Sequence, residues 1–132
     1  LPVDNLNYLC TPIFGLNLTK ITHRMQFSSF KINSSLLNAL NDLQITTPTT
    51  IQEKAFPVIM SGRDVVGIAQ TGTGKTISYL LPCLHQWKFT KEKSPTVLIV
   101  VPTRELVLQV VEDVENLSKY MQIRVAGVYG GV

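Results

Sequence analysis

The chain has 132 residues, of which 45% are hydrophobic and 16% are charged, and its formal net charge is +3. These values are typical of one globular domain and exclude a disordered or fibrous chain, and no apolar run is long enough to span a membrane. The weakly positive charge permits a nucleic-acid partner but does not require one. Cys10 and Cys83 lack the spacing of a metal site or a disulfide framework, which indicates reduced thiols.

The first 24 residues show neither a helical nor a strand period, and Pro12 interrupts their apolar stretch. They make a poor secretory signal, so we expect a cytoplasmic protein. Regular patterning begins at Met25. Our hypothesis is that residues 1–24 are an N-terminal extension that need not be native, and that 25–132 form the domain.

Two helices are expected first. Leucines between positions 36 and 43 fall on one face of a short helix, for which Ser34 or Ser35 is the expected N-cap. A second helix is expected to start near Thr49, and Pro57 to kink or end it.

The next elements alternate between strand and helix patterns. They are a strand at 65–69, a helix at 76–87, a charged loop at 88–95, a strand at 97–101, a helix from 106 to about 120 and a strand at 124–129. The strands at 65–69 and 97–101 are runs of apolar residues that suit a buried sheet. The order predicts an α/β fold with a parallel sheet of about three strands, flanked by helices.

The sharpest motif stands between the first of these strands and its helix. It reads Ala69-Gln70-Thr71-Gly72-Thr73-Gly74-Lys75-Thr76. Glycines here let successive backbone N–H groups surround a phosphate, and the following helix adds the positive end of its dipole. Lys75 can reach the β- and γ-phosphates, and the Thr76 hydroxyl can ligate Mg²⁺. We predict an ATP site here, with Lys75 and Thr76 as catalytic residues. A plain glycine-rich turn and a nucleotide site without turnover are the alternatives.

Residues around this phosphate loop resemble the DEAD-box RNA helicase family from about Met25 onward. The stretch 47–52, Thr-Pro-Thr-Thr-Ile-Gln, resembles the Q motif, in which the glutamine recognises adenine. The resemblance assigns adenine recognition to Gln52 and base stacking to Phe27, which lies 25 positions earlier (52 − 27), with Phe30 as the competitor. Gln52 also has capping-box spacing from Thr49, and Phe27 suits a core equally well.

Two further motifs resemble segments that contact the RNA backbone in this family. They are Pro102-Thr103-Arg104-Glu105-Leu106, which matches motif Ia, and Gly130-Gly131, which matches the GG motif. Contacts to the backbone alone would make RNA binding independent of base sequence. The alternatives are an N-cap role for Thr103, a surface pair of Arg104 with Glu105, and a simple turn at the glycines.

The resemblance implies that residues 25–132 are the N-terminal part of the first RecA-like P-loop NTPase domain of a helicase, which uses ATP and Mg²⁺ to separate short RNA duplexes. Gln44 and Ile45 depart from the family's usual glycine and aromatic residue before the Q motif. The Asp-Glu-Ala-Asp and Ser-Ala-Thr motifs do not occur in this sequence, nor does a second RecA-like domain. We therefore expect the stretch by itself to lack useful ATPase activity and to be marginally stable or prone to aggregation.

Two other functions stay open at this stage. One is a related superfamily-2 motor that acts on DNA. The other is a nucleotide- or RNA-binding module without catalysis.

Overall fold

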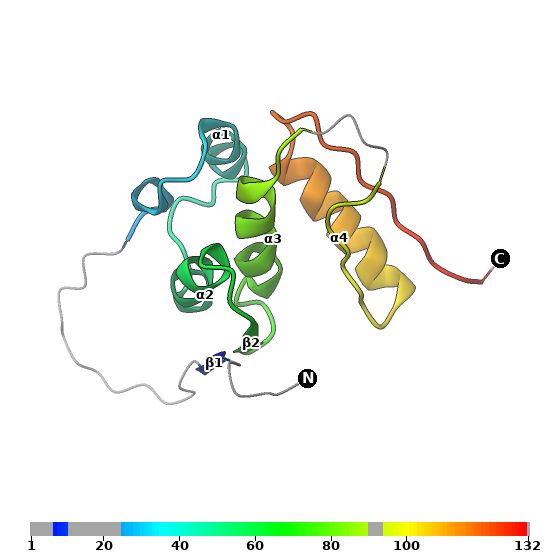
Figure 1. Cartoon of the computed structure of the whole chain (residues 1–132), viewed down its shortest axis with the longest axis horizontal. Helices are drawn as coiled ribbons and strands as arrows, with labels where there is room; N and C mark the ends of the chain where they lie inside the picture. Colours follow the sequence, from blue (N-terminus) through cyan, green and yellow to red (C-terminus); the bar gives the residue numbers. More distant parts are fainter. Residues whose placement is uncertain (1–6, 11–24, 90–93, 132) are drawn as a thin grey trace.

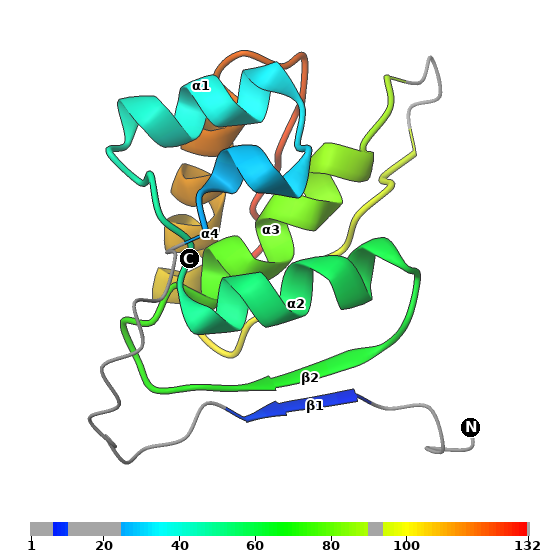
Figure 2. The ribbon, with the colours of Figure 1, turned by 90° about the vertical axis from the view of Figure 1, so that its left-hand side faces the viewer.

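The fold is described by a computed structural model, which defines residues 7–10, 25–89 and 94–131. Figure 1 shows α3 (Lys75–Gln86) between α2 (Thr50–Met60) and α4 (Arg104–Leu117), with α1 (Ser34–Asp42) above them. A single-turn 3-10 helix, Phe27–Phe30, precedes α1. The strands β1 (Asn7–Cys10) and β2 (Val65–Ile68) lie side by side beneath α2 (Figure 2).

The hydrophobic core lies where α3 packs against the other three helices. Burial of a leucine side chain stabilises a fold by about 1.5–3 kcal/mol, so a few such residues hold the helices together. The most buried members are Leu36, Leu40, Leu80, Leu81 and Leu117, each no more than 1% exposed.

The N-cap of α1 differs from the prediction. Asn33, rather than Ser34 or Ser35, caps the helix, and its Oδ1 accepts a hydrogen bond from the Leu36 N–H at 2.9 Å. Asn33 has the extended backbone of an N-cap, with φ −65° and ψ 154°, which makes Ser34 the first helical residue. Asn is as good a cap as Ser, so sequence preference alone did not separate them.

The second helix begins as expected, with Thr49 as its N-cap, but Pro57 does not end it. The helix continues to Met60, and the Pro57 carbonyl accepts from the Ser61 N–H at 3.1 Å. Pro57 is exposed, so its ring points to solvent and the helix loses one backbone hydrogen bond without disturbing the core.

The sheet is the largest departure from the predicted fold. In the described residues, β2 pairs only with β1, in parallel, with Asn7 opposite Val65 and Cys10 opposite Ile68. The strand predicted at 65–69 is therefore confirmed. Its neighbour β1 falls in the segment where the sequence showed no period.

The strands predicted at 97–101 and 124–129 are not formed within the described part of the chain. The burial expected at 97–101 is also wrong for Leu98 and Val100, which are 86% and 83% exposed, and Val128 is 87% exposed. Only alternate residues of these segments pack against the core, namely Ile99, Val101, Ile123 and Val125. An extended backbone points successive side chains to opposite faces, but a strand also needs a neighbour that offers backbone N–H and C=O groups. No such neighbour lies beside these segments among the described residues.

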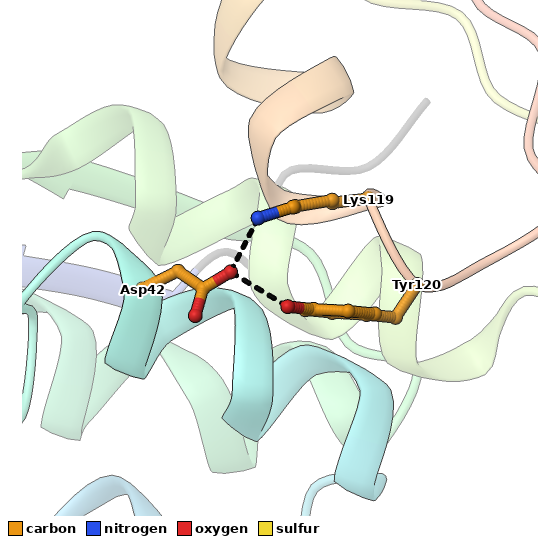
Figure 3. Close-up of polar contacts among 3 residues, drawn as sticks. All are labelled: Asp42, Lys119 and Tyr120. Atoms are coloured by element: carbon orange, nitrogen blue, oxygen red, sulfur yellow. Dashed lines mark hydrogen bonds and ion pairs between the residues drawn. The ribbon is translucent and has the colours of Figure 1, made fainter.

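A surface cluster ties the end of α1 to the turn after α4. Asp42 Oδ2 accepts from Lys119 Nζ at 2.6 Å and from the Tyr120 hydroxyl at 2.7 Å (Figure 3). These hydrogen bonds and the positive charge of Lys119 lower the pKa of Asp42, and the same contacts raise the pKa of Lys119. The partners lie more than 70 positions apart in the sequence, so no local pattern predicted this contact.

Candidate functional site

The loop between β2 and α3 has the predicted strand–loop–helix arrangement. Gly72 and Gly74 both have a φ of +77°, in the left-handed region that favours glycine. Gly74 is the N-cap of α3, so the loop delivers its backbone directly to the positive end of that helix.

Lys75 folds back across this loop. Its Nζ donates to the Ala69 carbonyl at 2.8 Å and to the Gln70 carbonyl at 2.6 Å. The Thr73 hydroxyl also donates to the Gln70 carbonyl, at 2.7 Å. An ammonium group therefore sits over the loop, held by neutral oxygens that a charged phosphate oxygen can replace with a stronger hydrogen bond.

The start of α2 is joined to the same loop by two side chains. The Thr49 hydroxyl donates to the Thr73 carbonyl at 2.9 Å, and Gln52 Nε2 donates to the Gly74 carbonyl at 3.0 Å. Gln52 Oε1 accepts from the Thr49 N–H at 2.9 Å, as in a capping box. The capping alternative is thus confirmed, but Gln52 does more, because it links α2 to the phosphate loop.

Gly74 faces a second constraint from this contact. A Cβ placed on it would collide with Gln52 Nε2, whereas a Cβ on Gly72 would meet no heavy atom within 4 Å. Gln52 is only 3% exposed, so it has little room to withdraw. The sequence motif explained glycine here by backbone conformation alone; the close approach of Gln52 appears only in the structure.

Thr76 lies half-buried in the first turn of α3 and is hydrogen-bonded to Tyr79. Burial raises the pKa of Tyr79 and the negative charge of Asp113 adds to it, while the Thr76 hydrogen bond opposes both. Burial, followed by the charge of Glu112, also raises the pKa of Asp113. In the described ranges, no group of three or more His, Cys, Asp or Glu side chains could hold a metal ion. A contact of the Thr76 hydroxyl with Mg²⁺ stays a prediction.

Phe27 has the core position that was the alternative to base stacking. It is 2% exposed and meets Phe30 edge-on, with ring centroids 5.6 Å apart. Phe30 in turn stacks on Phe56 at 4.9 Å. A role of Phe27 beside adenine stays a prediction.

The two predicted RNA-binding motifs are brought together at the start of α4. Thr103 is the N-cap, and its Oγ1 accepts from the Leu106 N–H at 3.3 Å, which confirms the capping alternative. Arg104 donates to the Gly131 carbonyl at 3.3 Å and lies over the Tyr129 ring, 4.6 Å from its centroid. Pro102, Glu105 and Gly130 are exposed around them.

Arg104 contacts Tyr129 and Gly131, and no ion pair of Arg104 with Glu105 is found in the described part of the chain. No hydrogen bond in the described ranges joins this second group to the phosphate loop. The predicted residues therefore lie in two separate groups, and the sequence did not predict the contact of Thr49 with Thr73 or that of Tyr129 with Arg104.

Comparison with known proteins agrees with these motifs. The model of the DEAD/DEAH box helicase family matches residues 49–132. The chain belongs to that family. It is 48% identical over 109 residues to the ATP-dependent RNA helicase SrmB of Escherichia coli, across 80% of the chain and 24% of the relative. It is 44% identical over 113 residues to the ATP-dependent RNA helicase DeaD of Buchnera aphidicola, across 84% of the chain and 19% of the relative.

Solved structures of this helicase family have the same fold. An RNA helicase of Chaetomium thermophilum bound to ADP superposes with a TM-score of 0.73 at 32% identity, across 80% of this chain and 27% of that one. A DEAD box protein of Methanococcus jannaschii gives 0.74 at 31%, across 82% and 30%. The predicted α/β, RecA-like fold class is therefore confirmed, although two of its predicted strands are not formed here.

This DEAD-box chain spans about a quarter or less of the length of the curated relatives named above. Among the described residues, none of the helices has the length and apolar character needed to cross a membrane.

Proposed function

We propose that this chain forms the ATP-binding part, and a share of the RNA-binding part, of an ATP-dependent RNA helicase. The observation that carries the proposal is the phosphate loop. Its two left-handed glycines, the ammonium group of Lys75 over its carbonyls and the helix that begins at Gly74 form one cradle for a triphosphate.

The proposed contact with the base uses the hydrogen-bonding groups of the Gln52 amide that its contacts to Gly74 and Thr49 do not use. An amide nitrogen has two donors and its oxygen two lone pairs, and the contacts to Gly74 and Thr49 use one of each. The second donor and the second lone pair match a ring nitrogen and the exocyclic amine of adenine. ADP in the structure of the Chaetomium helicase supports an adenine nucleotide. Stacking by Phe27 is part of the proposal, and it requires the 3-10 helix to uncover that ring.

The Mg²⁺ ion that accompanies ATP would use the Thr76 hydroxyl. Mg²⁺ keeps several waters and needs only one or two protein ligands beside the phosphates, so a single hydroxyl from this stretch suits it. The ion would neutralise phosphate charge. The protein groups of this chain would position the nucleotide through backbone N–H groups and Lys75.

RNA is proposed to lie along Arg104 and the glycines at 130–131. Relatives named as RNA helicases favour RNA over the DNA-motor alternative, and the phosphate loop favours a motor over a binding module without catalysis. A second RecA-like domain, which the resemblance implies, would complete the ATP site. We also propose that the protein is cytoplasmic.

Lys75→Ala in the whole protein tests the nucleotide site, with ATP affinity measured by isothermal titration calorimetry. Loss of the charge-assisted hydrogen bonds should weaken ATP binding by about 10- to 100-fold. Lys54→Ala is the matched control, because Lys54 is an exposed lysine of α2 close to Gln52 in sequence. Equal ATP affinity in Lys75→Ala and Lys54→Ala would refute the assignment.

Gln52→Ala tests base recognition through a ratio of affinities, because loss of the structural contacts to Thr49 and Gly74 should weaken ATP and GTP binding alike. The ratio of ATP to GTP affinity should fall toward one, since the methyl group of alanine cannot distinguish the two ring edges. A ratio unchanged from wild type would remove Gln52 from the adenine contact and leave it a purely structural link.

A further inference from the structure

Arg104 is held from two sides by the last described residues of the chain. The ring of Tyr129 lies under its guanidinium at 4.6 Å, and the Gly131 carbonyl accepts from Nη1 at 3.3 Å. Gly131 has a φ of +89°, which turns the chain at this point in a conformation that favours glycine. A single loop end thus supplies both contacts.

Tyr129 and Gly131 meet Arg104 because the segment that follows α4 lies along that helix. The segment runs back antiparallel to the helix in Figure 1. A Cβ on Gly127 would meet Val107 at 3.0 Å and Val111 at 3.1 Å, so Gly127 sits close against the helix about one turn beyond Arg104. From Gly127 to Tyr129 the extended chain advances about 6.6 Å. From Arg104 to the middle of the stretch between Val107 and Val111 the helix advances about 7.5 Å. The two lengths are similar, so Tyr129 lies level with Arg104.

Stacking leaves most of the guanidinium available. Arginine has five N–H donors in a plane, of which the Gly131 contact uses one. Tyr129 covers a face of that plane and not its edge, which is where a phosphate binds in a fork geometry. An exposed arginine without this support would lose side-chain entropy whenever it bound a phosphate.

We propose that Tyr129 is a positioning residue, which holds the Arg104 guanidinium in the orientation that binds an RNA phosphate. Motif Ia and the glycine pair then form one backbone-binding site and not two. This inference rests on the proposed RNA-binding function. It does not require a direct stack of Tyr129 on an RNA base, because the guanidinium already covers one face of the ring.

The test measures binding of single-stranded oligouridylate to the whole protein with a non-hydrolysable ATP analogue at several salt concentrations. Arg104→Ala should weaken binding and reduce the salt slope by about one, as loss of one phosphate contact requires. Tyr129→Ala should weaken binding about two- to fivefold, the range for an exposed cation–π contact, and reduce the slope in the same direction. Tyr129→Phe keeps the ring and should stay within about twofold of wild type.

Tyr120→Ala is the matched control. Tyr120 is 47% exposed against 42% for Tyr129, and it too lies beside a cation, with Lys119 5.3 Å from its ring, but it follows the opposite end of α4. This variant should leave RNA affinity unchanged. ATP affinity should be unchanged in Tyr129→Ala, which would show that the fold is intact.

The double variant of Arg104 and Tyr129 decides between positioning and direct contact. If Tyr129 acts only through Arg104, the double variant binds as weakly as Arg104→Ala alone. Additive losses would overturn the inference, as would a Tyr129→Ala protein that binds like wild type while Arg104→Ala is impaired. An Arg104→Ala protein with normal affinity and slope would instead remove this region from the RNA site, which is a failure of the proposed function.

Discussion

Alanine at position 74 is expected to damage this protein far more than alanine at position 72. The two glycines have the same φ of +77°, so both substitutions place an alanine in the left-handed region. Only Gly74 faces a neighbour, because its added Cβ would collide with Gln52 Nε2 while the one at Gly72 meets open space. The pair therefore separates backbone strain from the cost of breaking the link to α2.

The shared strain is about 1–2 kcal/mol for each variant. Gly74→Ala also breaks the 3.0 Å hydrogen bond from Gln52, whose donor is then left unpaired in a side chain only 3% exposed. An unpaired buried donor costs about 1–3 kcal/mol. We therefore expect Gly74→Ala to destabilise this region by about 2 kcal/mol more than Gly72→Ala, roughly a 30-fold difference in the local opening equilibrium.

Hydrogen–deuterium exchange of the whole protein is the suitable assay. Peptides that cover the first turn of α2 should exchange faster in Gly74→Ala than in Gly72→Ala, because Thr49 and Gln52 lose their partners in the loop. Equal protection of this turn in the two variants would refute the reasoning. The contact with Gln52 would then be unimportant, and left-handed backbone would be the only reason for glycine at position 74.

Three other results are expected. Asp42→Asn should lower the melting temperature at neutral pH, because a carboxyl whose pKa is lowered in the folded state stabilises the fold above its ordinary pKa. The difference from wild type should begin to shrink below a pH of about 4 and vanish once the pH has fallen through the lowered pKa, and a pH-independent difference would contradict the ion-pair explanation. Burial raises the pKa of Cys83, so iodoacetamide should alkylate it more slowly in the folded than in the unfolded protein at the same pH; equal rates would contradict this burial. Pro57→Ala should raise the melting temperature by restoring a helical N–H, with a gain of about 1–2 kcal/mol, and a lowered melting temperature would show that the ring is needed.

Several features of the site followed from local sequence signals. The phosphate loop could be placed because glycines, lysine and threonine stand at fixed spacing between a strand pattern and a helix pattern. The caps at Thr49 and Thr103 could be predicted because capping involves residues only three positions apart. Both the phosphate loop and the helix caps depend on residues that lie only a few positions apart in the sequence.

Contacts between distant residues had no such signal. Gln52 lies 22 positions from Gly74, Arg104 lies 27 from Gly131, and Asp42 lies 77 from Lys119. Each of these residues also suits an ordinary surface or capping role when taken alone. Their partners became visible only when the packing of α1, α2 and α4 was known.

The sequence by itself determined the family, the phosphate loop and most of the helices of this DEAD-box chain. It predicted buried strands at 65–69 and 97–101 and a further strand at 124–129, but it determined neither the exposure of Leu98 and Val100 nor which segments pair in a sheet. Tertiary structure decided that, and it also decided that Gln52 is joined to the loop and that Arg104 lies on Tyr129. The physical reason is that turns, caps and periodicity depend on neighbouring residues, whereas strand pairing and side-chain stacking require a partner that only the folded chain brings into contact.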